Sequence, residues 1–498
     1  MPLSTRDYGA FEDAAPASAD EGALAQARDT AIAVLSSAGL ASIVDLLAWR
    51  EADTIHAQSH RGHVSFPIGG GTRTVHSGQD VLELQDPLAQ TPLAAELADL
   101  RPIAPHYPFA HERLASVLAD PARSPDLIVI HTDAHFWPER GGHLGEHGNL
   151  GLLQSRAPLM VSGAGVKQRG ILAAAARTVD VGATLAWLSG TRDVDLEGLE
   201  GRPLTELVAR GAKHVVGLLL DGANCQALLD GAASGELPTL ARLLERGCAL
   251  QGGAIAEFPS VTLVNHTSAL TGLGPGRHGI LNNAFFDRGT GEQILANDSS
   301  TWHGACDLLS AGVKTLWELS PATNTACVNE PIDRGSRYAT MQLIRDSGEA
   351  SGAKGLGDRL PDPSDDPHVT REYLTNPDYS WSSRVDGLGL TQMLQLWSAS
   401  EVPELAWWNV ILTDAAHHNG GAHSPMAQAG LRDSDARIGE WLALVESRGL
   451  LEDTVILVTA DHGMTMADPE CRGDWNDALR AAGLDYRDES YGFLYLGV

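Results

Sequence analysis

The sequence predicts an α/β protein built on a doubly wound, mainly parallel sheet. Three apolar runs carry this prediction, at residues 215–220, 405–413 and 454–459. Continuous apolar runs of this length are typical of strands that are buried on both faces of a parallel sheet. Segments with helical spacing separate the runs, which favours strands joined by helices. A chain of 498 residues, 43% of them hydrophobic, is long enough for one large core with insertions.

The N-terminal part of the chain carries weaker signals. Residues 1–22 are polar and rich in Ala, Pro and Ser, which is typical of a loose tail. Residues 23–48 favour a helix, a break and a second apolar segment. Residues 126–130 and 157–162 are short apolar runs that predict buried strands, and residues 178–188 have apolar spacing suited to a helix. We treat 23–210 as one segment of a shared core.

The second segment, residues 211–498, opens on the first of the three apolar runs. A helix is predicted over residues 237–247, where Gly247 ends it. Residues 345–384 are rich in Gly, Pro, Asp and Ser, which indicates a loop or part of a cap inserted within residues 300–400. Both segments are expected to form one core.

The charge balance excludes polyanionic partners. The chain has 64 acidic and 35 basic residues and a net charge of −29. A field of this sign repels nucleic acid and anionic membranes, and it helps to hold divalent cations. The five cysteines show no metal-binding or disulfide spacing. The first 25 residues do not resemble a signal peptide, and no apolar stretch is long enough to span a membrane, so we expect a cytoplasmic protein.

Aspartates follow the three apolar runs. Asp221-Gly222 comes after the first, Asp414 after the second and Asp461-His462 after the third. Ligands of open α/β sheets bind beyond the carboxyl ends of strands, and Asp with His is a donor set suited to Zn²⁺ or Mn²⁺. Each pair alone also fits an ordinary turn. The three together indicate a metal site.

Histidines accompany the second aspartate and an upstream loop. His418 lies four residues after Asp414 in a Gly-rich segment expected to be a turn, and His417 and His423 are close alternatives. His147 lies in a loop between small residues, with His143 as its alternative. Ordinary polar loop residues are the competing interpretation for all five positions.

Thr262 is the candidate nucleophile. It precedes a segment suited to a helix, residues 265–271, where the helix dipole and free backbone N–H groups favour an anion. A metal ion can activate a threonine hydroxyl there. Asn265 could donate its amide to a phosphoryl oxygen. On this segment alone, a simple N-terminal helix cap is the favoured interpretation of the threonine.

These motifs resemble the nucleotide pyrophosphatase/phosphodiesterase family of the alkaline phosphatase superfamily. Residues 258–287, FPSVTLVNHTSALTGLGPGRHGILNNAFFD, are similar to its nucleophile segment. LLLDGA, DAAHHNGG and VTADHGM are similar to its metal-binding segments, and phosphonoacetate hydrolases are similar in the same places. The resemblance implies an alkaline phosphatase-like core with a cap and two divalent metal ions, most often Zn²⁺, with Mn²⁺ or Fe in relatives.

The resemblance also implies a role for each site residue. Thr262 and Asn265 would bind the phosphoryl group. One metal would be held by the set Asp221, Thr262, Asp461 and His462. The other would be held by the set Asp414, His418 and His147.

The order of the motifs departs from the family. The family ends with a Gly-x-His-Gly loop, a strand and a helix, but here the matching residues 145–207 come first and lead directly into residue 211. We infer a circular permutation. The chain end and the helix starting near residue 23 should then be neighbours in space.

The resulting hypothesis is a metal-dependent hydrolase that cleaves a small phosphodiester through a phospho-threonine intermediate. A phosphonate hydrolase is an alternative, for which Arg334 or Arg337 could bind a carboxylate. A phosphomonoesterase and a non-catalytic metal-binding homologue are further alternatives. His135 and Arg140 are candidates for substrate contact, whereas Trp407 and Trp408 are expected to pack in the core. The oligomeric state is not predicted.

Overall fold

A computed structural model describes residues 21–82, 107–137, 142–167, 170–349 and 351–497. Its larger sheet has eight strands in the order β17-β16-β18-β11-β19-β8-β12-β9. Strands β17, β16, β18, β11 and β19 are parallel to one another, and β8 is antiparallel to both of its neighbours. The predicted mainly parallel sheet is confirmed. Its strands are β8 (Leu159–Gly163), β9 (Gly170–Leu172), β11 (His214–Leu220), β12 (Gly247–Leu250), β16 (Thr325–Val328), β17 (Tyr338–Ala339), β18 (Leu405–Val410) and β19 (Thr454–Thr459).

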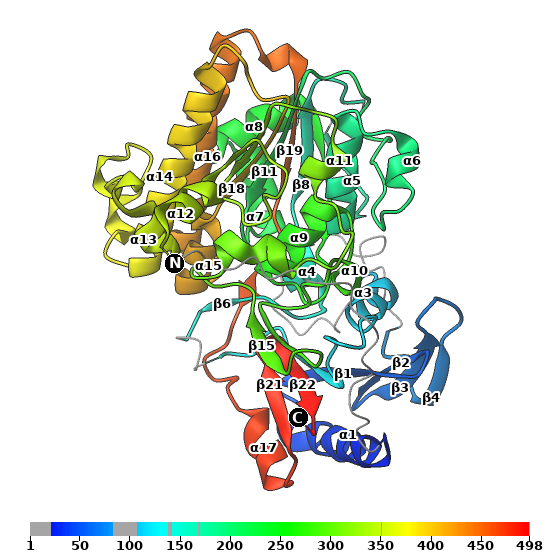
Figure 1. Cartoon of the computed structure of the whole chain (residues 1–498). Coiled ribbons are helices and arrows are strands. Elements are labelled where there is room, and N and C mark those ends of the chain that lie inside the picture. Colours follow the sequence, from blue (N-terminus) through cyan, green and yellow to red (C-terminus); the bar gives the residue numbers. More distant parts are fainter. Residues whose placement is uncertain (1–20, 83–106, 138–141, 168–169, 350, 498) are drawn as a thin grey trace.

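The central strands are buried because helices pack on this sheet in two groups. Every residue of β18 and β19 is buried, and so is every residue of β11 except His214. Helices α5 (Thr178–Leu188), α9 (Thr262–Thr271) and α11 (Leu316–Leu319) form one group. The other group contains α7 (Cys225–Ser234), α8 (Pro238–Glu245), α14 (Pro377–Ser398), α15 (Leu412–Gly420) and α16 (Pro425–Ser447). Figure 1 shows these helices around the central strands.

A second sheet of seven antiparallel strands was not predicted. Its order is β21-β22-β5-β1-β2-β3-β4, so it joins the two ends of the described chain. It lies apart from the larger sheet in Figure 1. Its strands are β1 (Val44–Glu51), β2 (Thr54–Ser59), β3 (Gly62–Pro67), β4 (Thr74–Gly78), β5 (Leu127–His131), β21 (Tyr486–Glu489) and β22 (Phe493–Leu496). The predicted strand at residues 126–130 is therefore real but belongs to this sheet.

Helix α1 (Glu21–Leu35) packs against strand β22. Ala31, Ile32 and Leu35 share a buried cluster with Leu494. The expected proximity of the first helix and the chain end is confirmed. Most of the predicted tail, residues 1–20, lies outside the described residues.

One large hydrophobic cluster contains residues of both segments, from Leu46 to Tyr495. Within the range assigned to a cap, β16 and β17 are strands of the larger sheet. The rest of that range is largely helical, with α12 (Thr340–Ser347), α13 (Gly352–Leu356) and the whole of α14. The loop predicted over residues 345–384 is thus partly wrong, because helix α14 begins at Pro377. In the part of the chain that the structure describes, no helix is long and apolar enough to cross a membrane.

Candidate phosphoester site

Three neighbouring strands of the larger sheet carry the predicted aspartates at their carboxyl ends. Strand β11 lies between β18 and β19. Asp221 directly follows β11, Asp461 follows β19 after one residue, and Asp414 lies at the start of α15, just after β18. All three side chains therefore meet at one edge of the sheet, where open α/β folds bind ligands.

The segment that carries Asp414 is a helix, and the predicted Gly-rich turn is wrong. Helix α15 begins at Leu412 and continues to Gly420. Residues four apart on a helix lie on the same face. As a result Asp414 Oδ1 lies 3.3 Å from His418 Nε2. The helix brings the two predicted ligands together as the turn was expected to do.

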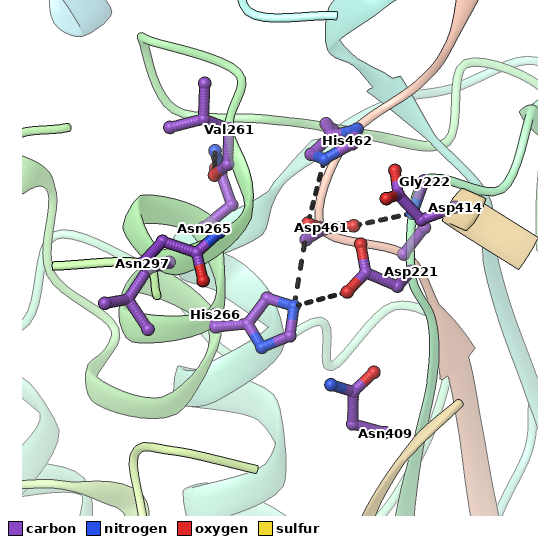
Figure 2. Close-up of polar contacts among 12 residues, drawn as sticks. Asp221, Gly222, Val261, Asn265, His266, Asn297, Asn409, Asp414, Asp461 and His462 are labelled. Atoms are coloured by element: carbon purple, nitrogen blue, oxygen red, sulfur yellow. Dashed lines mark hydrogen bonds and ion pairs between the residues drawn. The ribbon is translucent and has the colours of Figure 1, made fainter. Parts of the chain in front are cut away.

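Gly222 allows the three aspartates to crowd together. Its φ of +61° lies in the left-handed region, which glycine adopts most readily. A Cβ at this position would lie 2.5 Å from Asp414 Oδ1. The Gly222 N–H donates to Asp461 Oδ1 at 2.9 Å, as Figure 2 shows. A side chain here would separate groups that the site needs close together.

His147 reaches the same place from the other segment of the chain. Strand β6 (Gly145–Glu146) pairs with β20 (Thr465–Met466), which follows the Asp461-His462 loop. This pairing places the His147 ring on the His462 ring, with centroids 3.7 Å apart. His147 Nε2 lies 3.2 Å from His418 Nε2. The upstream histidine thus joins the downstream ligands, as predicted.

The candidate ligand atoms form two groups, which contain the residues of the two predicted metal sets except Thr262. Asp221, Asp461 and His462 form one group, and His147, Asp414 and His418 form the other. Within each group the ligand atoms lie within 4.8 Å of one another. Two carboxylates with one imidazole, and one carboxylate with two imidazoles, are donor sets suited to Zn²⁺ and its neighbours in the transition series.

The hydrogen bonds of the imidazoles support this fit. The Nδ1 atoms of His147 and His418 each donate to a backbone carbonyl, of Ser260 and Gly145 respectively. In the neutral rings both Nε2 atoms then present lone pairs, and these atoms face each other. A cation bound between the two nitrogens would resolve this contact. Asp221 Oδ1 is likewise buried with no hydrogen-bond partner.

Burial shifts the acid–base equilibria of the site. Desolvation raises the pKa of Asp414 to about 6, and desolvation together with Asp461 raises the pKa of Asp221 well above its usual range. Desolvation and the neighbouring His462 and His418 lower the pKa of His147 well below its usual range. These shifts reflect carboxylates and imidazoles packed together out of water. Positive charge between the carboxylates relieves their repulsion.

Thr262 is the first residue of helix α9 and lines the same cavity as three of the candidate ligands. This cavity has a volume of about 660 Å³. Its lining includes Asp221, Asp414 and His418 beside Thr262. A ten-residue helix directs its N-terminal dipole and free N–H groups at this point. The position is suited to a nucleophile that must approach an anionic phosphoryl group.

Asn265 does not point a free amide into the site. Its Nδ2 donates to the carbonyls of Glu257, Pro259 and Val261, and its Oδ1 accepts from the Glu257 N–H. The side chain is fully buried. Its hydrogen bonds hold the loop before α9, so its predicted role as phosphoryl donor is wrong.

Asn283 is the amide that the structure places at the start of α9. Its Oδ1 accepts from the Leu263 N–H at 3.4 Å, one residue after Thr262. Its distance of 21 residues from Thr262 in the chain hid its place beside the threonine. The signal was its place in the same matched segment.

His266 and Glu330 were also missed. His266 Nε2 lies 3.6 Å from both Asp221 Oδ2 and Asp461 Oδ2, as Figure 2 shows. His266 Nδ1 donates to Glu330 Oε2 at 2.8 Å. Burial would lower the pKa of His266, but Glu330 and the two aspartates outweigh it and hold this pKa well above its usual range. Glu330 follows strand β16 as the aspartates follow their strands, which was the available signal.

The alternative histidines differ in position. His143 lines the cavity, and its ring centroid is 4.3 Å from that of His418, so it stays a candidate ligand. His417 is buried and donates from Nδ1 to the Thr413 carbonyl, outside both ligand groups. His423 is exposed outside the cavity, as the competing interpretation expected.

The remaining substrate-contact candidates lie elsewhere. His135 is buried beside Trp137, with ring centroids 4.3 Å apart, and does not line the cavity. Arg140 lies outside the described residues. Trp407 and Trp408 are fully buried in β18, which confirms their predicted packing role.

The fold and the site define a large α/β protein with two carboxylate–histidine groups at the carboxyl ends of its parallel strands, facing a helix that begins with threonine. The sequence profile of type I phosphodiesterase / nucleotide pyrophosphatase matches residues 215–498, more than half of the chain. The chain belongs to this family. His147 and the residues around it precede the matched region.

Individual relatives are similar over shorter stretches. An uncharacterized pyrophosphatase/phosphodiesterase of Schizosaccharomyces pombe is 38% identical over 93 residues, which are 18% of each chain. The alkaline phosphatase PafA of Elizabethkingia meningoseptica is 32% identical over 115 residues, 23% of this chain and 20% of the relative. The matched stretches thus span about a fifth of these relatives.

Two solved structures are similar in part. Murine ectonucleotide pyrophosphatase / phosphodiesterase 5 is 16% identical with a TM-score of 0.34, covering 52% of this chain and 59% of its own. Phosphonoacetate hydrolase from Sinorhizobium meliloti is 22% identical with a TM-score of 0.34, covering 53% and 59%.

Proposed function

We propose that the protein hydrolyses a small phosphodiester in two steps, through a phosphorylated Thr262. The observation that carries the proposal is the cavity where Thr262, at the start of α9, meets two groups of metal-ligating side chains. Family membership supports the same reaction class. Two divalent ions, of which Zn²⁺ suits the donors best and Mn²⁺ or Fe are alternatives, would supply the Lewis acidity that phosphoryl transfer needs.

The residues of the chain then have separate roles. Asp221, Asp461 and His462 would hold one ion beside Thr262, and Asp414, His418 and His147 would hold the other. The Thr262 Oγ attacks phosphorus, and the bond from phosphorus to the leaving oxygen breaks with its electron pair. Water then attacks the phosphothreonine and restores the hydroxyl. Asn283, whose Oδ1 accepts from the Leu263 N–H, and the start of α9 would bind the phosphoryl oxygens.

The cavity lining favours a diester. None of the described residues that line the cavity is a lysine or an arginine. Arg334 pairs with Glu318 at 2.9 Å, and Arg337 lies 3.7 Å from Glu401. Neither arginine lines the cavity. A phosphonate that carries a carboxylate, or a doubly charged monoester, finds no lysine or arginine there. A diester needs fewer positive charges.

The far end of the cavity is apolar. Met341, Ile344, Leu356 and Val385 belong to a small buried cluster with the half-buried Trp302 and Trp381 packed on it. All six residues line the cavity. Indole rings bind flat apolar or aromatic groups and cations. We infer that this end holds an uncharged aromatic or otherwise apolar ester group of the substrate.

The first prediction concerns substrate and metal together. The metal-stripped protein is expected to be inactive, and Zn²⁺ or Mn²⁺ is expected to restore hydrolysis of bis-p-nitrophenyl phosphate. Turnover of p-nitrophenyl phosphate should be at least about tenfold lower in kcat/KM, a difference of about 1.4 kcal/mol. Release of p-nitrophenolate measures both.

Preference for the monoester would still support the proposed metal site, but it would make the protein a phosphomonoesterase. Hydrolysis of phosphonoacetate without turnover of either ester would replace the proposal with a phosphonate hydrolase. Metal binding at both groups without any turnover would indicate a non-catalytic homologue.

The second prediction concerns the apolar end. Trp302→Ala is expected to lower kcat/KM for bis-p-nitrophenyl phosphate about tenfold more than for methyl p-nitrophenyl phosphate, since an aromatic contact contributes about 1–1.5 kcal/mol. Trp302→Phe keeps a ring and should retain most of the discrimination. An equal loss on both substrates would place the aromatic ester group elsewhere.

We further propose that the family order is circularly permuted in this chain. The family profile begins at residue 215, whereas His147 joins the downstream ligands from upstream. A circular permutation requires that the first helix and the chain end lie close together, and α1 does contact β22. The cytoplasmic location and the absence of nucleic acid and membrane partners stay predictions of the sequence.

A further inference from the structure

Three histidines form a row on the seven-stranded sheet, away from the phosphoester site. His56 lies on β2, His63 on β3 and His76 on β4. Trp49 on β1 is paired directly with His56, and the two rings stack with centroids 5.0 Å apart. These strands lie at the edge of the molecule in Figure 1, outside the cavity that Thr262 lines.

The three side chains are close enough to bind one ion. One nitrogen of each ring lies within 4.8 Å of the others. His56 Nδ1 and His63 Nε2 are 3.0 Å apart, and the rings of His63 and His76 stack with centroids 4.6 Å apart. Two imidazole nitrogens bound to one tetrahedral Zn²⁺ at about 2.0–2.1 Å are separated by roughly 3.3 Å. A small adjustment therefore converts the observed contact into shared coordination.

Polar groups next to the three histidines fix the orientation of the His56 and His76 rings. Glu51 Oε1 accepts from Arg28 at 2.8 Å and from Trp49 Nε1 at 2.9 Å. These bonds hold Glu51 Oε2 3.8 Å from His56 Nε2, on the side of the ring opposite His63. A carboxylate behind a ligating histidine is a recurring feature of metal sites. Ser65 Oγ lies 2.7 Å from His76 Nε2 and fixes the orientation of the third ring.

We propose that His56, His63 and His76 bind one divalent transition-metal ion of the Zn²⁺ type, separate from the phosphoester site. Three imidazoles without a carboxylate ligand favour Zn²⁺, Ni²⁺ or Cu²⁺ over Mg²⁺ or Ca²⁺. His56 and His63 are half-buried and His76 is exposed, so a water molecule can complete the coordination. The ion ties β4, whose residues are all exposed, to β2 and β3.

Metal content tests the proposal directly. The full-length protein is stripped with a chelator, dialysed against Zn²⁺ and measured by mass spectrometry of the metal. His63→Ala and His76→Ala are each expected to contain about one Zn²⁺ per chain less than the wild type. His60→Ala removes an exposed histidine outside the row and should match the wild type. The comparison between variants does not depend on how many ions the phosphoester site holds.

A second readout separates this site from the first. Zn²⁺ should raise the Tm of the wild type by more than that of His76→Ala, while the diesterase activity of His76→Ala stays within twofold of the wild type. His76 is exposed, so its replacement leaves the core intact even where His63→Ala does not fold. Equal zinc content in the wild type and His76→Ala would overturn the proposal, and so would an equal loss in His60→Ala.

Discussion

Replacing Thr262 with alanine is expected to lower kcat for bis-p-nitrophenyl phosphate by about 10⁶-fold, the scale of loss seen when a nucleophile is removed. Thr262 is the first residue of helix α9, and it lines the same cavity as Asp221 and Asp414. Without its Oγ no phosphothreonine can form. Single-turnover release of p-nitrophenolate by the metal-loaded variant measures the loss.

The control is Thr262→Ser, which keeps a hydroxyl at the same position and should retain measurable turnover. Acid quenching of the wild type during turnover is expected to trap phosphate on the peptide that contains Thr262, as detected by mass spectrometry. A Thr262→Ala variant that keeps its metals and loses less than tenfold in kcat would mean that water attacks the substrate directly.

Thr262 apart, Glu330→Gln is expected to lower metal affinity and folding stability more than a change at any other residue outside the two ligand groups. Glu330 is fully buried, and its carboxylate accepts from His266 Nδ1, Trp407 Nε1 and the Ile332 N–H. It therefore fixes the ring whose Nε2 faces Asp221 and Asp461. Loss of a carboxylate behind a metal site costs roughly 10–100-fold in metal affinity. Removing one partner of a buried ion pair costs about 3–5 kcal/mol of folding stability.

Zn²⁺ titration and urea unfolding of the metal-free protein measure the two effects of Glu330→Gln. Glu318→Gln is the matched control, because Glu318 pairs with Arg334 near the surface and should contribute at most about 1 kcal/mol. If both variants behaved alike in both measurements, Glu330 would have no positioning role. A loss of stability without a loss of Zn²⁺ affinity would limit Glu330 to a structural role.

Local sequence predicted the elements that depend on local pattern. The buried strands β11, β18 and β19 were readable because a continuous apolar run is what a strand covered on both faces requires. Helices α5 and α8 could be predicted from apolar spacing. The predicted end of α8 at Gly247 lies two residues beyond its last residue, Glu245. Helix α15 was misread because its glycines and histidines resemble a turn, whereas packing against α14 and α16 stabilises it as a helix.

Pairing between distant segments was not readable. The seven-stranded sheet joins residues from both ends of the chain, and a strand's own sequence does not specify which partner it pairs with. Asn265 was misread for a different, local reason. Its type and spacing fitted a phosphoryl donor, but the backbone carbonyls that occupy its amide come from the loop directly before α9.

The sequence by itself determined the residue types of the site: aspartates after parallel strands, a threonine before a helix, and histidines close to two of the aspartates. These follow from residue type and local pattern. Only the tertiary structure decided which groups meet. It brought His147 onto His462, placed His266 and Glu330 behind two aspartates, and left the cavity without a lysine or arginine among its described lining. Contacts between residues far apart in the chain depend on how the elements pack, and packing is a property of the whole core.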